Sequence, residues 1–157
     1  MTSREERVLV LAPTGRDAAL ACSMLGAAGL TAEICSTVQD LCASISDTAG
    51  AILIAEEALP PAAVQRLVTA LDGQPAWSDL PLIVFAGGEF TTSSLRPLNV
   101  LGPLRNVMVL ERPVRRLIFI RSVQVALRAR RRQYEMRAHL EERAQLLDRE
   151  RAARARG

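Results

Sequence analysis

Two adjacent carboxylates end an apolar run in the stretch AGAILIAEEALPP, residues 49–61. Glu56 and Glu57 follow the run directly, and Pro60 and Pro61 come soon after them. A carboxylate in such a place can accept a phosphoryl group, help to hold a divalent cation or pair with a basic side chain. The two acids therefore form a chemical site or are what remains of one. The residues that lie beside them in the fold decide between these two possibilities.

Five short apolar segments alternate with stretches of helical periodicity. Continuous apolar runs are typical of strands covered on both faces, and their alternation with helices predicts a parallel sheet. Right-handed crossovers make this sheet doubly wound. We therefore expect an α/β fold: a flavodoxin-like, doubly wound five-stranded parallel sheet, (βα)5, with an extended C-terminal helix. The predicted strands cover 7–11, 31–36, 51–55, 80–86 and 106–111, and the predicted helices 16–30, 37–47, 61–72, a region near 92–102, and everything from 112 onward.

The carboxyl ends of the predicted strands would meet at one edge of the sheet. In flavodoxin-like folds this edge carries the functional groups. Glu56 is therefore expected close to the residues that follow the other strands. Those residues are Ala12 and Pro13, Ala86 and Gly87, and Glu111, Arg112 and Pro113.

These strand ends carry a resemblance to a known family. The segments VLVLAP (8–13), AILIAEEALP (51–60), PLIVFAGG (81–88) and LERPV (110–114) resemble, in order, four motifs of the receiver domain of bacterial response regulators. The resemblance covers roughly residues 7–127. It implies a receiver-like domain over residues 1–127 and a helical extension over 128–157.

The resemblance also implies a degenerate phosphoacceptor pocket. Receiver domains use an acidic pair for magnesium, an aspartate that is phosphorylated, a Thr or Ser hydroxyl and a Lys-Pro motif. Phosphoryl transfer without the acidic pair and the hydroxyl lacks its cation and its charge stabilisers. We therefore expect no catalysis, no metal and no cofactor. The matching positions here are Ala12 and Pro13, Glu56, Ala86, and Arg112 with Pro113.

Two interpretations of Glu56 remain open. It can form a fixed ion pair with Arg112, in place of the contact between a phosphate and a lysine, which would hold the domain in one state. Alternatively, Glu56 and Glu57 only cap the exposed strand end and the start of the next helix, where negative charge is favourable.

Charge is divided unevenly along the chain. Residues 1–111 carry six arginines and twelve acidic residues, a net charge of −6, whereas residues 112–157 carry fourteen arginines and five acidic residues, a net charge of +9. Cys22, Cys35 and Cys42 lack the spacing of a zinc site, and the single histidine lies in the charged tail. No apolar run is long enough to span a membrane, and we expect a cytoplasmic protein.

The tail contains more apolar residues than packing on a sheet requires. Between Val114 and Arg156 there is no Gly or Pro, and a helix of this length, about 65 Å, would leave the body. One apolar stripe, including Leu117 and Val125, suits the sheet, and a second suits a parallel homodimer with a coiled coil. The alternative is a single solvated helix. The predicted dimer interface comprises Ile120, Val123, Leu127 and Tyr134, continued after a phase shift by Met136, Leu140 and Leu147.

These patterns favour a non-enzymatic, receiver-like signalling module that relays through its last helix. Its expected partners are a second copy and a sensor histidine kinase or downstream signalling domain. The alternative is a stand-alone regulator whose basic helix, with its RARRR run at 128–132, binds RNA or DNA. Arginines spread around the helix, without stacking aromatics, argue against nucleic acid, and a narrow apolar stripe argues against a membrane surface.

Overall fold

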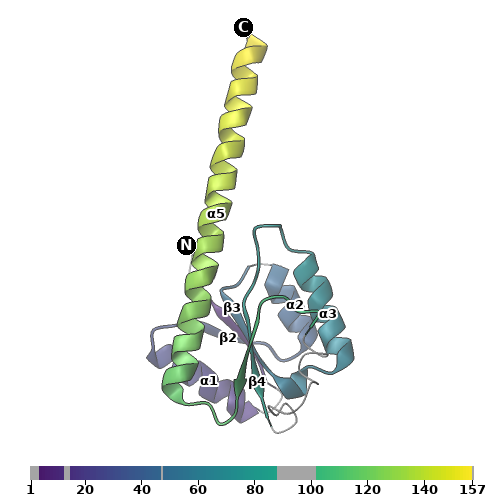
Figure 1. Ribbon diagram of the computed structural model, residues 1–157, viewed down its shortest axis with the longest axis vertical. Helices are drawn as coiled ribbons and strands as arrows, with labels where there is room; N and C mark the ends of the chain where they lie inside the picture. Colours follow the sequence, from purple (N-terminus) through teal and green to yellow (C-terminus); the bar gives the residue numbers. More distant parts are fainter. Residues whose placement is uncertain (1–3, 13–14, 47, 88–101, 157) are drawn as a thin grey trace.

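The computed structural model describes residues 4–12, 15–46, 48–87 and 102–156. Five strands form one parallel sheet in the order β2-β1-β3-β4-β5, which confirms the predicted flavodoxin-like arrangement (Figure 1). Most of β1 and β3 is fully buried, as their continuous apolar sequences predict. The strands are β1 Val8–Leu11, β2 Ala32–Ile34, β3 Ala51–Ala55, β4 Leu82–Ala86 and β5 Val107–Glu111.

Helices cover both faces of the sheet. In Figure 1, α1 and α5 lie on one side and α2 and α3 on the other. Each side has its own apolar core, because successive residues of β1 and β3 point alternately to the two faces. The helix expected near 92–102 falls almost wholly outside the described residues. The described helices are α1 Gly15–Ala27, α2 Val38–Ser46, the short 3-10 turn η1 Glu56–Ala58, α3 Pro61–Asp72 and α5 Arg116–Arg156.

Local sequence signals set several helix ends. The Thr37 hydroxyl accepts a hydrogen bond from the backbone N–H of Asp40 at 3.1 Å and so caps the start of α2. Pro61 opens α3 at its first turn, where its missing N–H has no cost. Gly29 has a φ of 77° and follows α1, the usual place for a left-handed glycine.

A buried arginine ties the start of the sheet to the end of α2. The Arg7 guanidinium donates through Nη2 to the carbonyl oxygens of Ser44 at 2.9 Å and Thr48 at 3.1 Å, and it pairs with Glu33. A cation at the C-terminal end of a helix meets the negative end of its dipole. These hydrogen bonds and the ion pair offset the cost of burying the Arg7 guanidinium, and they cap the C-terminal end of α2.

The long last helix packs on the sheet through the face that the sequence assigned to dimerisation, and that assignment is wrong. Val123, Leu127 and Tyr134 are 0%, 2% and 4% exposed, and half-buried Ile120 packs on the same core. Ile120, Val123 and Leu127 share an apolar core with α1 and the sheet, because a helix with two apolar faces can dock by either one. The face expected to pack on the sheet, with Leu117, Ile118 and Val125, is exposed instead.

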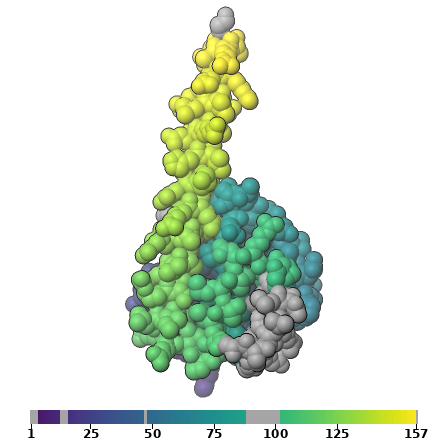
Figure 2. Space-filling model, viewed as in Figure 1, coloured from purple at the N-terminus to yellow at the C-terminus, as the bar shows by residue number. Residues whose placement is uncertain are grey.

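The remaining predicted interface residues lie on a free part of the helix. Met136, Leu140 and Leu147 are exposed, and the last two lie on the segment of α5 that projects beyond the body (Figures 1 and 2). The helix keeps contact with the body through Arg137, so the boundary expected after Leu127 falls inside the packed part. Among the described residues, no helix is both long and apolar enough to cross a membrane.

Candidate functional site at the carboxyl ends of the strands

The strand register brings the predicted site residues to one edge. Leu11 of β1 lies beside Ile54 of β3, and Ala86 of β4 lies beside Glu111 of β5. The next residues along each strand therefore meet at this edge. Those described are Ala12, Glu56, Gly87, Arg112 and Pro113, while Pro13 lies outside the described residues.

Arg112 pairs with Glu57, not with Glu56 as the sequence suggested. Its guanidinium donates through Nη1 to Oε1 at 2.5 Å and through Nη2 to Oε2 at 3.1 Å, a two-pronged contact. The hydrogen bonds from Arg112 lower the pKa of the Glu57 carboxyl, and the same contact raises the pKa of Arg112. The η1 turn explains the exchange of partners, because consecutive side chains of a 3-10 turn point about 120° apart.

Glu56 turns inward and is held by the backbone after β4. Its Oε1 accepts a hydrogen bond from the N–H of Gly87 at 2.7 Å. A Cβ at position 87 would come within 2.8 Å of that oxygen, so glycine permits the close approach. The other oxygen, Oε2, is buried and finds no hydrogen-bond donor among the described residues. The two neighbouring acids thus have separate roles, and neither faces open solvent as a free carboxylate.

The side chains at this edge do not fit a magnesium ion. Magnesium is held by carboxylates and other oxygen ligands in a strict octahedral arrangement. Ala12 and Ala86 bring no side-chain oxygen, and the described part of the chain contains no group of three or more His, Cys, Asp or Glu that could hold a metal ion. The described residues also lack a hydroxyl where Ala86 stands. We therefore derive no reaction step through a metal at this site.

No protein-family model matches the sequence, and no curated protein matches it. Solved structures do match. NtrX from Brucella abortus in complex with ADP has 16% identity and a TM-score of 0.67, over 88% of this chain and 29% of that one. A CheY-like receiver domain from Methanospirillum hungatei JF-1 has a TM-score of 0.65 and 16% identity, over 82% of this chain and 98% of that one. The fold is that of a response-regulator receiver domain.

A third solved structure matches a larger share of this chain. A fusion that carries a trimeric coiled-coil segment of yeast Spc42 has 18% identity and a TM-score of 0.65, over 94% of this chain and 97% of that one. This chain spans less than a third of the length of NtrX. At these identities the comparisons establish the receiver fold alone.

An apolar pocket adjoins the strand-end edge between α1 and the start of α5. It has a volume of about 560 Å³, and Leu20, Met24, Phe85 and Phe119 are among the residues that line it. Arg112 borders it, but that guanidinium is already engaged by Glu57. The described walls offer no nucleophile with an adjacent base, so the pocket adds no chemistry to the edge.

At the opposite end of the sheet, α5 is fixed by a buried arginine that the sequence analysis treated only as part of a basic run. Arg130 is 0% exposed, and burial lowers its pKa. Its Nε donates to the carbonyl oxygen of Ala49 at 2.9 Å, and its Nη1 donates to Ser78 Oγ at 2.8 Å and Gln133 Oε1 at 2.6 Å. The run RARRR predicted a basic surface but not a buried arginine, because arginine is rarely fully buried.

Aromatic rings complete this attachment. The Arg130 and Arg137 guanidinium groups both lie over Tyr134, each 4.8 Å from the ring centroid, and Trp77 lies 5.8 Å from Tyr134. The Tyr134 hydroxyl is 2.8 Å from the carbonyl oxygens of Glu5 and Ala49 and donates to one of them at a time. We call Trp77, Arg130, Tyr134 and Arg137 the helix anchor.

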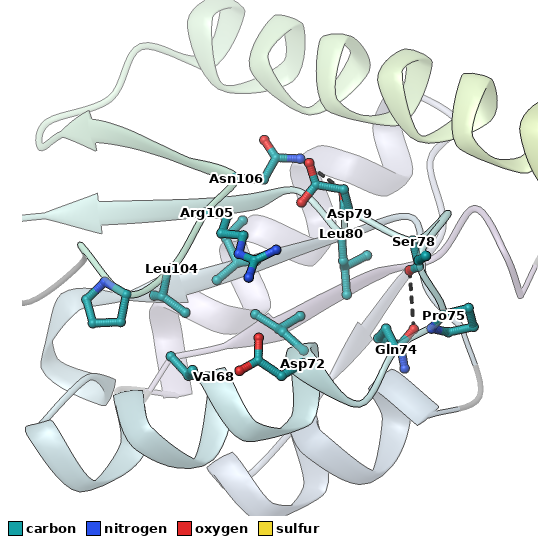
Figure 3. A pocket seen from close by; sticks show the side chains of 14 residues that line it. Val68, Asp72, Gln74, Pro75, Ser78, Asp79, Leu80, Leu104, Arg105 and Asn106 are labelled. Carbon is teal, nitrogen blue, oxygen red and sulfur yellow. Dashed lines mark hydrogen bonds between the residues drawn. The ribbon is translucent and has the colours of Figure 1, made fainter.

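A polar hollow borders the helix anchor. Figure 3 shows this hollow, of about 380 Å³, between the end of α3 and the segments that enter β4 and β5. Hydrogen bonds join parts of its rim: Asn106 Nδ2 donates to Asp79 O at 2.9 Å, and Ser78 Oγ donates to Gln74 Oε1 at 3.3 Å. Gln133 of α5 also bonds the backbone of Asp79. This part of the rim thus supports α5.

Proposed function

We propose that this chain is a cytoplasmic, non-catalytic receiver-like module of a two-component-type signalling system. It is not phosphorylated, it self-associates through its last helix, and α5 relays the arrangement of the bodies to a sensor histidine kinase or a downstream signalling domain. The observation that carries this proposal is the strand-end edge, where alanines and an internal ion pair replace the groups that phosphoryl transfer requires.

The internal pairing at the edge supports a module with one fixed state. A receiver changes state when a new anion appears at the strand ends and attracts neighbouring groups. Here Arg112 is already engaged by Glu57, and the backbone of Gly87 is engaged by Glu56. The Arg112 guanidinium and the Gly87 N–H would have to break these contacts before they could bind a phosphate.

The helix anchor supports a relay through α5. A helix transmits the position of a domain only if its base cannot hinge, and four buried or stacked side chains hold this base. The exposed Met136, Leu140 and Leu147 support self-association beyond it. The similarity to a protein described as a trimeric coiled-coil fusion agrees with a helix of that kind.

The basic tail is a weaker basis for nucleic-acid binding than its sequence implied. Arg130 is buried, Arg131 pairs with Glu6 at 3.0 Å, and Arg137 pairs with Glu5 at 2.9 Å. These contacts remove part of the positive charge that would bind phosphates. We therefore keep relay by self-association as the proposed function.

Phosphorylation can be tested directly. The chain is incubated with acetyl phosphate and Mg²⁺, and its intact mass is measured beside a phosphorylatable receiver domain as positive control. We expect no added phosphoryl group on this chain. A hydroxylamine-sensitive adduct that disappears in Glu56→Gln would overturn the proposal, because Glu56 would then be an acceptor.

A further inference from the structure

An apolar stripe on α5 stays uncovered along most of the helix. Its members are exposed both where α5 crosses the body and where it projects. At about 100° per residue they fall within an arc of about 60°. We call this set the free stripe: Ile118, Val125, Ala129, Met136, Leu140 and Leu147.

The free stripe repeats every eleven residues. Eleven residues make about three helical turns, so the stripe drifts by only about 20° per repeat on a straight helix. Such a period is typical of helices that pair over a long length with a slight right-handed supercoil. The two series with this spacing are Ile118, Ala129 and Leu140, and Val125, Met136 and Leu147.

The free stripe is not a continuation of the packing on the body. The face that buries Leu127 and Tyr134 becomes polar once the helix has left the body, where it carries Glu141, Gln145 and Asp148. The free stripe keeps apolar residues over the same segment. A helix that faced only solvent there would gain nothing from them, so they indicate a partner outside the body.

One flank of the free stripe carries arginines with the same period. An arginine recurs every eleven residues beside the stripe, and all four are exposed. The opposite flank carries small or uncharged side chains at the corresponding places. The arginines are Arg121, Arg132, Arg143 and Arg154, and the opposite flank has Ser122, Gln133 and Ala144.

Building on the proposed function, we infer that the partner is a second copy of this chain, paired in parallel and in register along the free stripe. In a parallel pair the arginine flank of one helix faces the uncharged flank of the other. In an antiparallel pair the two arginine flanks would face each other and repel. The charge pattern therefore selects the parallel arrangement.

The body takes part at the start of the stripe. A shallow hollow of about 340 Å³ lies between β5 and the exposed face of α5. Its mostly apolar walls can receive side chains from a partner helix, so the contact extends from Ile118 to Leu147, about 44 Å. The hollow is lined by Met108, Leu117, Ile118, Arg121, Ser122 and Val125.

Two neighbouring leucines provide a matched test by disulfide trapping in the full 157-residue chain. Leu146 and Leu147 are 54% and 47% exposed, but only Leu147 belongs to the free stripe. A disulfide needs Cα atoms about 4.4–6.8 Å apart, which a parallel, in-register pair provides at stripe positions. We expect Leu147→Cys and Val125→Cys to form covalent dimers at least about fivefold faster than Leu146→Cys, with the parent chain and its native thiols as baseline.

A charge substitution provides an independent readout. Leu140→Glu places an unpaired charge in the stripe of both copies, whereas Gln145→Glu places the same charge on the opposite, exposed face. By analytical ultracentrifugation we expect Leu140→Glu to raise the dimer Kd by at least about tenfold and Gln145→Glu to change it by less than about twofold.

The outcomes separate this inference from the proposed function. A chain that is monomeric at every concentration overturns both. A dimer that is trapped faster by Leu146→Cys, or trapped only between Val125→Cys and Leu147→Cys, overturns the parallel free stripe and leaves self-association standing. A particle of three copies overturns the two-chain pairing. If Leu147→Cys forms a disulfide no faster than Leu146→Cys and Leu140→Glu leaves the dimer Kd unchanged, the interface lies elsewhere and the free-stripe inference is overturned.

Discussion

Glu56 and Glu57 show how two identical neighbours acquire different chemistry from the backbone alone. The η1 turn directs Glu57 to the guanidinium of Arg112 and Glu56 to the N–H of Gly87. The strand-end cluster could be predicted from the sequence, because parallel strands end at one edge. The pairing within it could not, because apolar patterns set strand ends but not the direction of each side chain in a turn.

Removing the Glu57 charge tests the strand-end pair. Glu57→Gln should lower the free energy of unfolding at pH 7 by about 0.5–1 kcal/mol, a small value because the pair is partly exposed. The pKa of Glu57 is lowered below its ordinary value of 4.5 in the folded state. The pair therefore stabilises the fold above that pH and ceases to do so as the pH falls through the folded-state pKa.

The measurement is urea unfolding of the wild type and Glu57→Gln at pH 7 and at about pH 3. The difference between them should narrow in acid, while Glu141→Gln on the projecting helix should match the wild type at both values. An equal difference at both pH values would show that the charge of Glu57 is not its cause.

Among the elements, α5 is a helix as the sequence predicts, but the face that packs on the sheet is not the one that the sequence indicated. Apolar residues lie on two of its sides, and periodicity cannot say which side meets the sheet. Two residues decide it in the structure. Gly50 leaves room for Leu127, and the buried Arg130 bonds the backbone that leads into β3. A glycine before a strand and one arginine among many carry too little signal to be read in advance.

Filling the space at Gly50 should disrupt this docking. A Cβ there would lie 2.5 Å from Leu127 Cδ2 and 2.8 Å from the carbonyl oxygen of Glu6. Gly50→Ala should therefore lower the free energy of unfolding by about 1–3 kcal/mol. Gly26→Ala is the control, because a Cβ added to Gly26 within α1 would meet no atom within 4 Å, and it should stabilise by about 0.5–1 kcal/mol.

Both glycine variants are compared by urea unfolding. A Gly50→Ala variant as stable as the wild type would mean that α5 does not approach the body as closely as the structure places it.

In the whole molecule, sheet order and the two-sided cover follow from the alternation of buried strands and helices. The site at the strand ends and the helix anchor lie at opposite ends of the sheet, and α5 runs between them (Figure 1). The sequence could predict that the helix leaves the body. It could not predict where, because the residues that hold the helix are polar and aromatic and break the apolar pattern.

Two truncations test where the body ends. A chain cut after Leu127 loses Arg130 and Tyr134 and should be destabilised by about 3–5 kcal/mol, comparable to deleting a large buried side chain. A chain cut after Ala138 keeps the helix anchor and should unfold within about 0.5 kcal/mol of the full chain. Unfolding is measured at concentrations low enough for single copies, so that association does not contribute. Equal stabilities would mean that the anchor does not hold the helix.

The projecting part of α5 is a lever arm. From Arg137 to Arg156 it reaches about 28 Å past its fulcrum, at about 1.5 Å per residue. A tilt of about 10° at the base would move the tip by about 5 Å, close to one helical pitch. Slight reorientations of one body against another would thus be magnified at the far end, where even a small domain could sense them without any bond being made or broken.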